Sequence, residues 1–266
     1  MELTDILFPA LWFAALGAVF GLVLAIAARV FAVKTDPRVP LLQEALPGAN
    51  CGGCGFSGCA AYAEAIAKGE ADVNRCNAGG AAVAAALAAV MGVEAGEVVE
   101  KRAVVKCTAT KSQATIKYNY EGAQDCVSAA RLGGGNRLCE LGCIGLGTCV
   151  EACKFGAIKV EDGVARISPD LCTGCGACAN VCPKHIIELV PRKNGYYVGC
   201  SSTENPKLTR TACTLGCFSC RLCEKNCPAG AITVTDSLAH INYDLCTNCG
   251  KCATVCPRHI IHAPKN

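Results

Sequence analysis

Aromatic side chains and charge are both scarce in this 266-residue chain. One tryptophan, six tyrosines and seven phenylalanines are too few to form a large aromatic core. Charged residues make up 18% of the chain and the net charge is only +3, which excludes a disordered chain and gives no support to nucleic-acid binding. Something other than apolar burial must therefore help to hold the fold together.

Cysteine, by contrast, is abundant, with 24 residues in the chain. Such a content normally marks a small secreted disulfide scaffold, but this chain is too long for that class. The remaining roles for these cysteines are metal ligand, reactive thiol and inert buried residue. The cellular compartment helps to decide between a disulfide and these roles, and the N-terminus predicts the compartment.

Residues 6–28 carry no charge, and a helix of this length is about 35 Å long, enough to cross a bilayer. A secretory signal is the alternative, but Glu2 and Asp5 precede the run where a signal would have basic residues. Arg29 and Lys34 follow it, so the positive-inside rule places the N-terminus outside and the rest of the chain in the cytoplasm. We therefore expect a single membrane helix in contact with lipid, with the cysteines on the cytoplasmic side, where stable disulfides are rare.

Three prolines in residues 36–47 predict a semi-extended tether after this helix. Glycines between Cys51 and Cys59 then let the backbone wrap tightly while several sulfurs converge. Helices are expected at residues 60–68 and 77–90. The candidate ligands of this first cluster are Cys51, Cys54, Cys59 and Cys76. Four thiolates fit zinc or a [4Fe–4S] cluster, and this spacing lacks the paired knuckles of common zinc sites, which favours the cluster.

The second half of the chain contains an internal repeat with a period of 74 residues and no gap. Cys126, Cys139, Cys143, Cys149, Cys153, Cys172, Cys175, Cys178 and Cys182 fall on Cys200, Cys213, Cys217, Cys223, Cys227, Cys246, Cys249, Cys252 and Cys256. Flanking words repeat as well, including Cys-Pro-Lys-His-Ile-Ile and Cys-Pro-Arg-His-Ile-Ile. One module is therefore used twice.

The run C-x2-C-x2-C-x3-C-P occurs three times, beginning at Cys172, Cys217 and Cys246. This is the spacing of bacterial ferredoxins, in which three cysteines hold one cubane and the fourth holds the other cluster of a pair. The proline after the fourth cysteine predicts the start of a helix there. Small β-hairpins are expected from alternating segments at residues 157–160, 164–167, 231–234 and 240–241.

The crossing rule predicts four clusters in the two modules. In the second module they are Cys217, Cys220, Cys223 and Cys256 (cluster 4) and Cys227, Cys246, Cys249 and Cys252 (cluster 5). In the first module Leu146 stands where the second has Cys220, so Cys139 is inferred to supply the missing ligand. The first-module clusters are then Cys139, Cys143, Cys149 and Cys182 (cluster 2) and Cys153, Cys172, Cys175 and Cys178 (cluster 3).

Five [4Fe–4S] clusters leave Cys107, Cys126, Cys200 and Cys213 without a role. Four is the number that a sixth cluster needs, but these residues lie far apart along the chain. The alternative is that they are buried apolar thiols beside the other clusters. The expected fold class is α+β, with a membrane anchor (1–33), a small α-rich [4Fe–4S] domain (34–100) and two ferredoxin-like modules (101–193 and 194–266).

The order of these motifs resembles the B subunit of the Rnf complex. The resemblance rests on the apolar N-terminal run, the word PGANCGGCGFSGC, the segment YEGAQDC ending at Cys126, the word LCELGCIGLGTCVEAC, and the second ferredoxin module. In that family the complex is an ion-translocating ferredoxin:NAD+ oxidoreductase. The resemblance implies that this chain lies in the bacterial cytoplasmic (inner) membrane, accepts electrons from reduced ferredoxin and relays them to other subunits.

No nucleotide or flavin fingerprint is present, and no catalytic acid, base or nucleophile can be named, so hydride chemistry is expected in a partner subunit. Two alternatives stay open: a membrane polyferredoxin of another complex, such as one that reduces a redox sensor as the Rsx complex does, and a structural zinc-binding module. Basic residues beside the cysteines could steer an acidic ferredoxin or be ordinary solvated charges. They are Lys154, Lys184, Arg210, Arg221, Lys225, Lys251 and Arg258.

Overall fold

The computed structural model describes residues 3–31, 36–193 and 195–263. It divides into two compact units, Met1–Pro37 and Arg38–Asn266. The predicted domain boundaries at residues 33/34 and 193/194 fall at positions outside the described residues. Lys34, one of the basic residues behind the predicted sidedness, also lies outside them. The expected cluster-bearing segments lie in the second unit.

The first unit contains helix α1 (Leu3–Val30), which confirms the helix predicted from the apolar run. Its stretch Leu11–Val30 is long and apolar enough to cross a membrane, and no part of that stretch is buried in protein. Trp12 and Phe20 are each about three-fifths exposed. A face this apolar indicates a membrane-associated chain.

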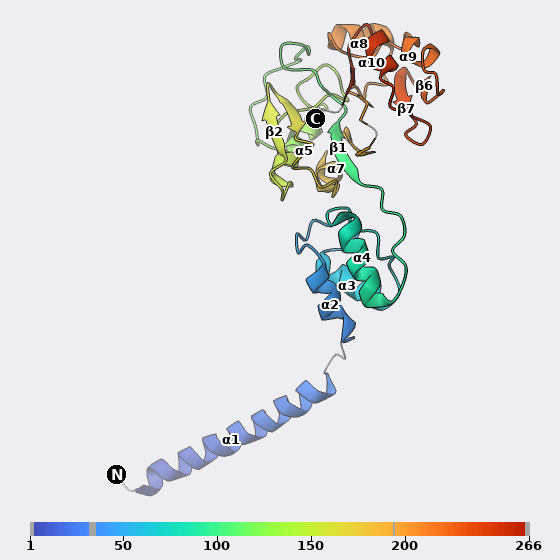
Figure 1. Ribbon diagram of the computed structural model, residues 1–266. Coiled ribbons are helices and arrows are strands. Elements are labelled where there is room, and N and C mark those ends of the chain that lie inside the picture. Colours follow the sequence, from blue (N-terminus) through green and yellow to red (C-terminus); the bar gives the residue numbers. More distant parts are fainter. Residues whose placement is uncertain (1–2, 32–35, 194, 264–266) are drawn as a thin grey trace. The chain divides into compact units, whose positions relative to one another are not determined.

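The second unit begins with three packed helices, α2 (Arg38–Ala45), α3 (Cys59–Ala67) and α4 (Gly80–Met91), which Figure 1 shows as one group. The tether predicted for residues 36–47 is therefore wrong over α2. Pro40 lies in the first turn of α2, where a backbone amide needs no helical acceptor. Leu42 is fully buried and belongs to the core that α3 and α4 share, so packing overrides the extended preference of the prolines.

Each ferredoxin-like module contains two small antiparallel sheets and short helices (Figure 1). In the first module, β1 (Lys101–Val105) pairs with β4 (Ile187–Pro191) and β2 (Ile158–Glu161) with β3 (Val164–Ile167), and the helices are α5 (Cys126–Arg131), α6 (Thr148–Glu151) and α7 (Ala177–Val181). In the second, β5 (Tyr197–Val198) pairs with β8 (Ile261–His262) and β6 (Ile232–Thr235) with β7 (Leu238–Ile241), and the helices are α8 (Pro206–Ala212), α9 (Leu222–Lys225) and α10 (Lys251–Val255). The two predicted hairpins are confirmed.

The helix predicted to begin at the proline after the fourth cysteine is wrong. In the first module α7 begins one residue before the third cysteine, Cys178, and ends before the fourth, Cys182, which has an extended conformation. Pro183 follows that end and cannot continue the helix. In the second module α10 ends before Cys256 in the same way. The short helix therefore sets the spacing between the third and fourth cysteines.

Strand pairing shows which residues of the two modules are structurally equivalent before Cys126. Val105 pairs with Ile187, and Val198 pairs with Ile261, which lies 74 residues after Ile187. Cys107 and Cys200 each lie two residues beyond these strand positions. The backbone thus makes Cys107 equivalent to Cys200, although the sequence repeat pairs Cys200 with Cys126.

The first module has 19 more residues between Cys107 and Cys139 than the second has between Cys200 and Cys213, and part of this longer segment joins the two modules. Thr115 N–H donates to the Ala212 carbonyl at 2.9 Å, and Thr214 N–H donates to the Gln113 carbonyl at 2.9 Å. On the other side, Leu138 N–H donates to the Thr115 carbonyl at 2.8 Å. This extended segment is therefore hydrogen-bonded to both modules at once.

Candidate iron–sulfur sites

The cysteines group into six sets of four, which account for all 24. Shared chambers or mutual electrostatic influence group all of them except Cys249, which is assigned by its place in the run that begins at Cys246. We number these candidate sites as follows. Site 1 is Cys51, Cys54, Cys59 and Cys76; site 2 is Cys126, Cys143, Cys149 and Cys182; site 3 is Cys153, Cys172, Cys175 and Cys178; site 4 is Cys217, Cys220, Cys223 and Cys256; site 5 is Cys227, Cys246, Cys249 and Cys252; site 6 is Cys107, Cys139, Cys200 and Cys213.

Sites 1 and 4 each line a small chamber with all four of their cysteines. The chamber of site 1 has an empty volume of about 350 Å³, and that of site 4 about 360 Å³. Burial raises the pKa of the Cys76 thiol, and the charges of the other three site 1 cysteines raise it further. The predicted ligand sets of clusters 1 and 4 therefore lie together.

Sites 3 and 5 are recognised from the mutual influence of their thiols. Burial raises the pKa of Cys178 to about 12, and the charges of Cys172, Cys175 and Cys153 add to the rise. Burial likewise raises the pKa of Cys252, with contributions from the charges of Cys246 and Cys227. In each module the last cysteine of the earlier run thus reaches the site formed by the later run, as the crossing rule predicts.

Site 2 differs from the set predicted by spacing, because Cys126 takes the place expected for Cys139. Cys126, Cys143, Cys149 and Cys182 line one chamber with an empty volume of about 350 Å³. Burial raises the pKa of Cys149 to about 12, and the charges of Cys143, Cys126 and Cys182 are among the other causes. Cys126 opens α5, and its N–H donates to the Thr148 hydroxyl at the start of α6, which holds it beside Cys149.

Cys139 instead lies in site 6, in a chamber with an empty volume of about 420 Å³ between the modules. Burial raises the pKa of the Cys139 thiol, as do the charges of Cys107 and Cys213. Two cysteines come from each module: Cys107 is equivalent to Cys200 by strand pairing, and Cys139 to Cys213 by the 74-residue shift. The predicted sixth set named Cys126 where the structure has Cys139.

Backbone amides point at the sulfurs of site 6. Cys200 Sγ accepts from the N–H of Cys217 at 3.4 Å and from that of Ser202 at 3.5 Å. Cys213 Sγ accepts from Leu215 N–H at 3.3 Å. Hydrogen bonds of this kind favour a charged sulfur, and they are one of the means by which a protein sets the potential of an iron–sulfur cluster.

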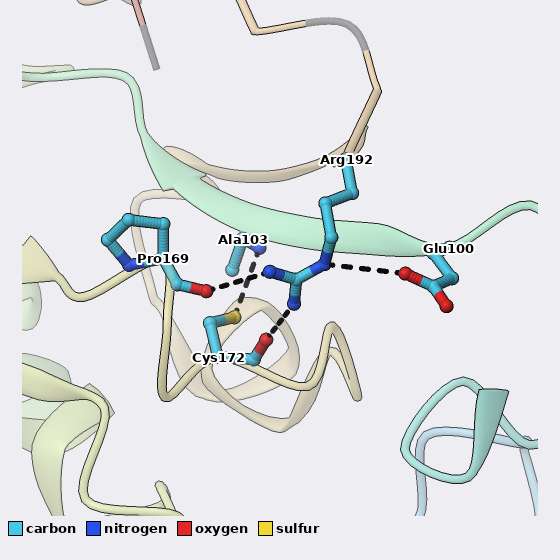
Figure 2. A network of polar contacts seen from close by, with 5 residues as sticks. All are labelled: Glu100, Ala103, Pro169, Cys172 and Arg192. Atoms are coloured by element: carbon cyan, nitrogen blue, oxygen red, sulfur yellow. Dashed lines mark hydrogen bonds and ion pairs between the residues drawn. The ribbon is translucent and has the colours of Figure 1, made fainter. Parts of the chain in front are cut away.

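Arg192 fixes the loop that carries Cys172 of site 3, as Figure 2 shows. Its guanidinium donates to the Pro169 carbonyl at 2.9 Å and to the Cys172 carbonyl, and it pairs with Glu100 at 3.7 Å. Ala103 N–H donates to Cys172 Sγ at 3.3 Å. Arg192 therefore ties Glu100, which directly precedes β1, to the loop that carries Cys172. The same loop is held against β1 by the hydrogen bond from Ala103 to the Cys172 sulfur.

These chambers fit iron–sulfur clusters by the chemistry of their donors. Burial raises the pKa of Cys143 and of Cys223 to about 11 and that of Cys200 to about 12, so without a cation these thiols are neutral at pH 7. A bound cluster supplies the positive iron that keeps them as thiolates. Within the described residues no three cysteine, histidine or acidic side chains are placed to hold a single metal ion. The four thiolates of a cubane each bind a different iron, so they stand further apart than the ligands of one ion.

Contacts between sites show which of them adjoin. Site 4 adjoins site 6, because Cys217 N–H donates to Cys200 Sγ at 3.4 Å. Cysteines of sites 6, 2 and 3 pack in one hydrophobic core, which includes Cys107, Cys149 and Cys178. These four sites are therefore neighbours.

Two cysteines are open to solvent among residues 36–193 and 195–263: Cys220 of site 4 and Cys249 of site 5. Basic residues surround this end of the second module. Arg210 and Arg258 lie over the Phe218 ring, at 4.7 Å and 5.7 Å from its centroid. The second module thus combines accessible sulfur with positive charge.

Sequence reasoning missed Arg137, which is 4% exposed and lines the site 6 chamber. Its guanidinium donates to the carbonyls of Ala109 at 2.8 Å and Gly163 at 2.7 Å. Its charge lowers the otherwise raised pKa values of Cys143 and Cys213. The one available signal was its position two residues before Cys139, which by itself does not separate a buried cation from a surface one.

Comparison with protein families agrees with these sites. A family model of an Fe-S cluster domain matches residues 46–78, which include all of site 1. A 4Fe-4S dicluster domain matches twice, over residues 142–186 and 216–260. [4Fe–4S] chemistry is therefore indicated for both modules, and an Fe-S cluster for the α-rich segment.

The chain is also similar to full-length relatives. It is 45% identical to the B subunit of the Na(+)-translocating ferredoxin:NAD(+) oxidoreductase complex of Acetobacterium woodii, over 97% of this chain and 78% of the relative. It is 42% identical to the B subunit of the ion-translocating oxidoreductase complex of Methanosarcina acetivorans, over 93% and 94%. The B subunit of the proton-translocating ferredoxin:NAD(+) oxidoreductase complex of Clostridium ljungdahlii is 41% identical, over 93% and 89%.

Proposed function

Because this chain belongs to the family of B subunits of ion-translocating oxidoreductase complexes, we propose that it takes electrons from reduced ferredoxin and relays them through six [4Fe–4S] clusters to other subunits of a ferredoxin:NAD+ oxidoreductase. The observation that carries the proposal is the gathering of all 24 cysteines into six sets of four. A [4Fe–4S] cluster, when bound, accepts and gives up one electron. The chain's own residues hold the clusters, donate hydrogen bonds to their sulfurs and exclude water.

The proposed ligands are sites 1 to 6 as defined above, so Cys126 serves site 2 and Cys139 serves site 6. The equivalence of the residue pairs Cys107/Cys200 and Cys139/Cys213 supports site 6. Its chamber also has a volume of the same order as those of sites 1, 2 and 4. The proposed domains are the membrane anchor, the α-rich domain of site 1, and the two modules.

Iron analysis of the full chain, purified anaerobically in detergent, tests this function. About 24 irons with matching sulfide are expected per chain, and reduced ferredoxin should produce the electron paramagnetic resonance signals of reduced clusters. Zinc in place of iron would instead support the structural zinc module. Loaded clusters that ferredoxin fails to reduce would favour a polyferredoxin of another complex, such as one that reduces a redox sensor.

We place the ferredoxin-docking face on the second module, where Cys220 and Cys249 are exposed. Lys225 and Lys251 are exposed beside these sites, on α9 and at the start of α10. Opposite charges steer redox partners together, and such steering raises association rates by about 10 to 1,000-fold at low salt. The membrane helix, with Arg29 in its last turn, supports a cytoplasmic position for this face.

Replacing Lys225 and Lys251 together by glutamate is expected to slow reduction by ferredoxin by about 10-fold or more at low salt, and much less at high salt. Stopped-flow reduction over a range of ionic strength measures this. Lys159→Glu is the matched control, because Lys159 is an exposed lysine on β2 that lies outside the four chambers described above. A double variant with the salt dependence of the wild type would show that these lysines are ordinary solvated charges.

A further inference from the structure

The loop of site 1 touches the backbone of site 3 at Gly53. A Cβ on Gly53 would lie 2.8 Å from the carbonyl carbon of Cys175 and closer still to its carbonyl oxygen. Real Cβ atoms do not approach backbone so closely, so a side chain fits only if the two loops separate. Cys175 also lines the chamber of site 1, although it belongs to site 3.

The Cys175 loop has little room to move away from this contact. A Cβ on the preceding residue, Gly174, would lie 2.7 Å from the carbonyl carbon of Lys101, the first residue of β1. β1 is paired along its length with β4, and Arg192 holds the adjoining Cys172 carbonyl. The Cys175 loop is therefore enclosed between β1 and the site 1 loop.

Cysteines of the two sites adjoin at this contact, because Cys175 lines the site 1 chamber together with Cys51. Cys51 and Cys175 are both candidate ligands, so the gap between the two candidate clusters is bridged by one pair of adjoining side chains. Electron tunnelling through protein weakens steeply with distance, so a contact of this kind provides a direct route.

We propose that Gly53 is a positioning residue for electron transfer, whose missing side chain lets site 1 and site 3 act as consecutive stations of the relay. The proposal rests on the proposed function, with ferredoxin as the reductant. One electron crosses at a time: site 3 is oxidised by one electron, site 1 is reduced by one, no bond forms or breaks, and no proton moves. Joined to the neighbour relations above, this contact makes site 3 the station through which electrons from the two modules reach site 1.

Gly53→Ala in the full chain tests this contact. The variant is expected to retain its iron but to weaken the magnetic interaction between reduced sites 1 and 3, seen as slower spin relaxation in electron paramagnetic resonance power saturation. Ser57→Ala is the matched control, since Ser57 is an exposed residue of the same loop. A fully loaded Gly53→Ala protein with wild-type relaxation would overturn the proposal.

A second comparison decides the matter if Gly53→Ala fails to load site 1. Cys76→Ala removes site 1 through a ligand outside the loop that contacts Cys175, and Cys249→Ala removes site 5 instead. Only Cys76→Ala should slow the spin relaxation of site 3, and equal effects of these two variants would contradict the proposal. Wild-type protein without any reduced-cluster signal would overturn the proposed function itself, which is a distinguishable result.

Discussion

Replacing Cys107 and Cys139 together by alanine is expected to remove about 4 irons, whereas replacing Cys107 and Cys126 together is expected to remove about 8. The first pair lies in one chamber, site 6, so its loss affects one cluster. The second pair is divided between site 6 and site 2, so its loss affects two. Iron and sulfide analysis of the two variants measures the difference.

This pair of variants also separates the structural assignment from the one predicted by spacing. If Cys139 served cluster 2 and Cys126 the sixth cluster, the two results would be exchanged. If the four leftover cysteines were inert buried thiols, the Cys107/Cys126 variant would keep all of its iron. Alanine is chosen because, unlike serine, it offers no oxygen that could replace the lost sulfur as a ligand.

Removal of iron by an anaerobic chelator is expected to unfold both ferredoxin-like modules while much of the α-rich domain stays folded. The hydrophobic core of the first module includes Cys107, Cys143, Cys149, Cys172 and Cys178, and that of the second includes Cys200, Cys217, Cys223, Cys252 and Cys256. The core shared by α2, α3 and α4 has one buried cysteine, Cys76, among larger apolar side chains such as Tyr62 and Leu87. The modules therefore depend on their clusters far more than the α-rich domain does.

The magnitudes support this expectation. A domain is stable by about 5–15 kcal/mol, and a structural zinc site alone contributes about 10–16 kcal/mol of apparent binding free energy to folding. Losing two or more clusters of comparable binding strength would therefore exceed the stability of a module. Limited proteolysis with circular dichroism, before and after chelation, measures the effect, and reconstitution with iron and sulfide is the control. An unchanged protease pattern in the modules of the iron-free chain would contradict the prediction.

The regular part of this architecture could be predicted because its information is local. The cysteine runs that begin at Cys172, Cys217 and Cys246 lie within short stretches of chain, and the hairpin strands next to them show a clear alternation. Helix α2 was missed because three prolines favour an extended chain locally, whereas the burial of Leu42 depends on α3 and α4, which come later in the sequence.

The exchange of Cys126 and Cys139 could not be predicted for a related reason. An ungapped repeat aligns Cys126 with Cys200, and nothing in residues 106–125 marks an insertion. The true equivalence becomes visible only when β1 pairs with β4, whose residues lie more than eighty positions further along the chain. Local spacing predicts which cysteines share a loop, but tertiary pairing decides which loops share a cluster.

Site 6 has a consequence for how such a chain can be assembled. Each module alone carries only half of this site, a pair of cysteines at equivalent positions, and neither pair can complete four ligands within its own module. With site 6 holding a cluster as proposed, insertion of that cluster would wait until both modules have been synthesised and have docked through the segment around Thr115. The cluster of site 6 would then join the two modules covalently through its cysteines, so maturation of this part of the relay and the tertiary assembly of the modules would be coupled.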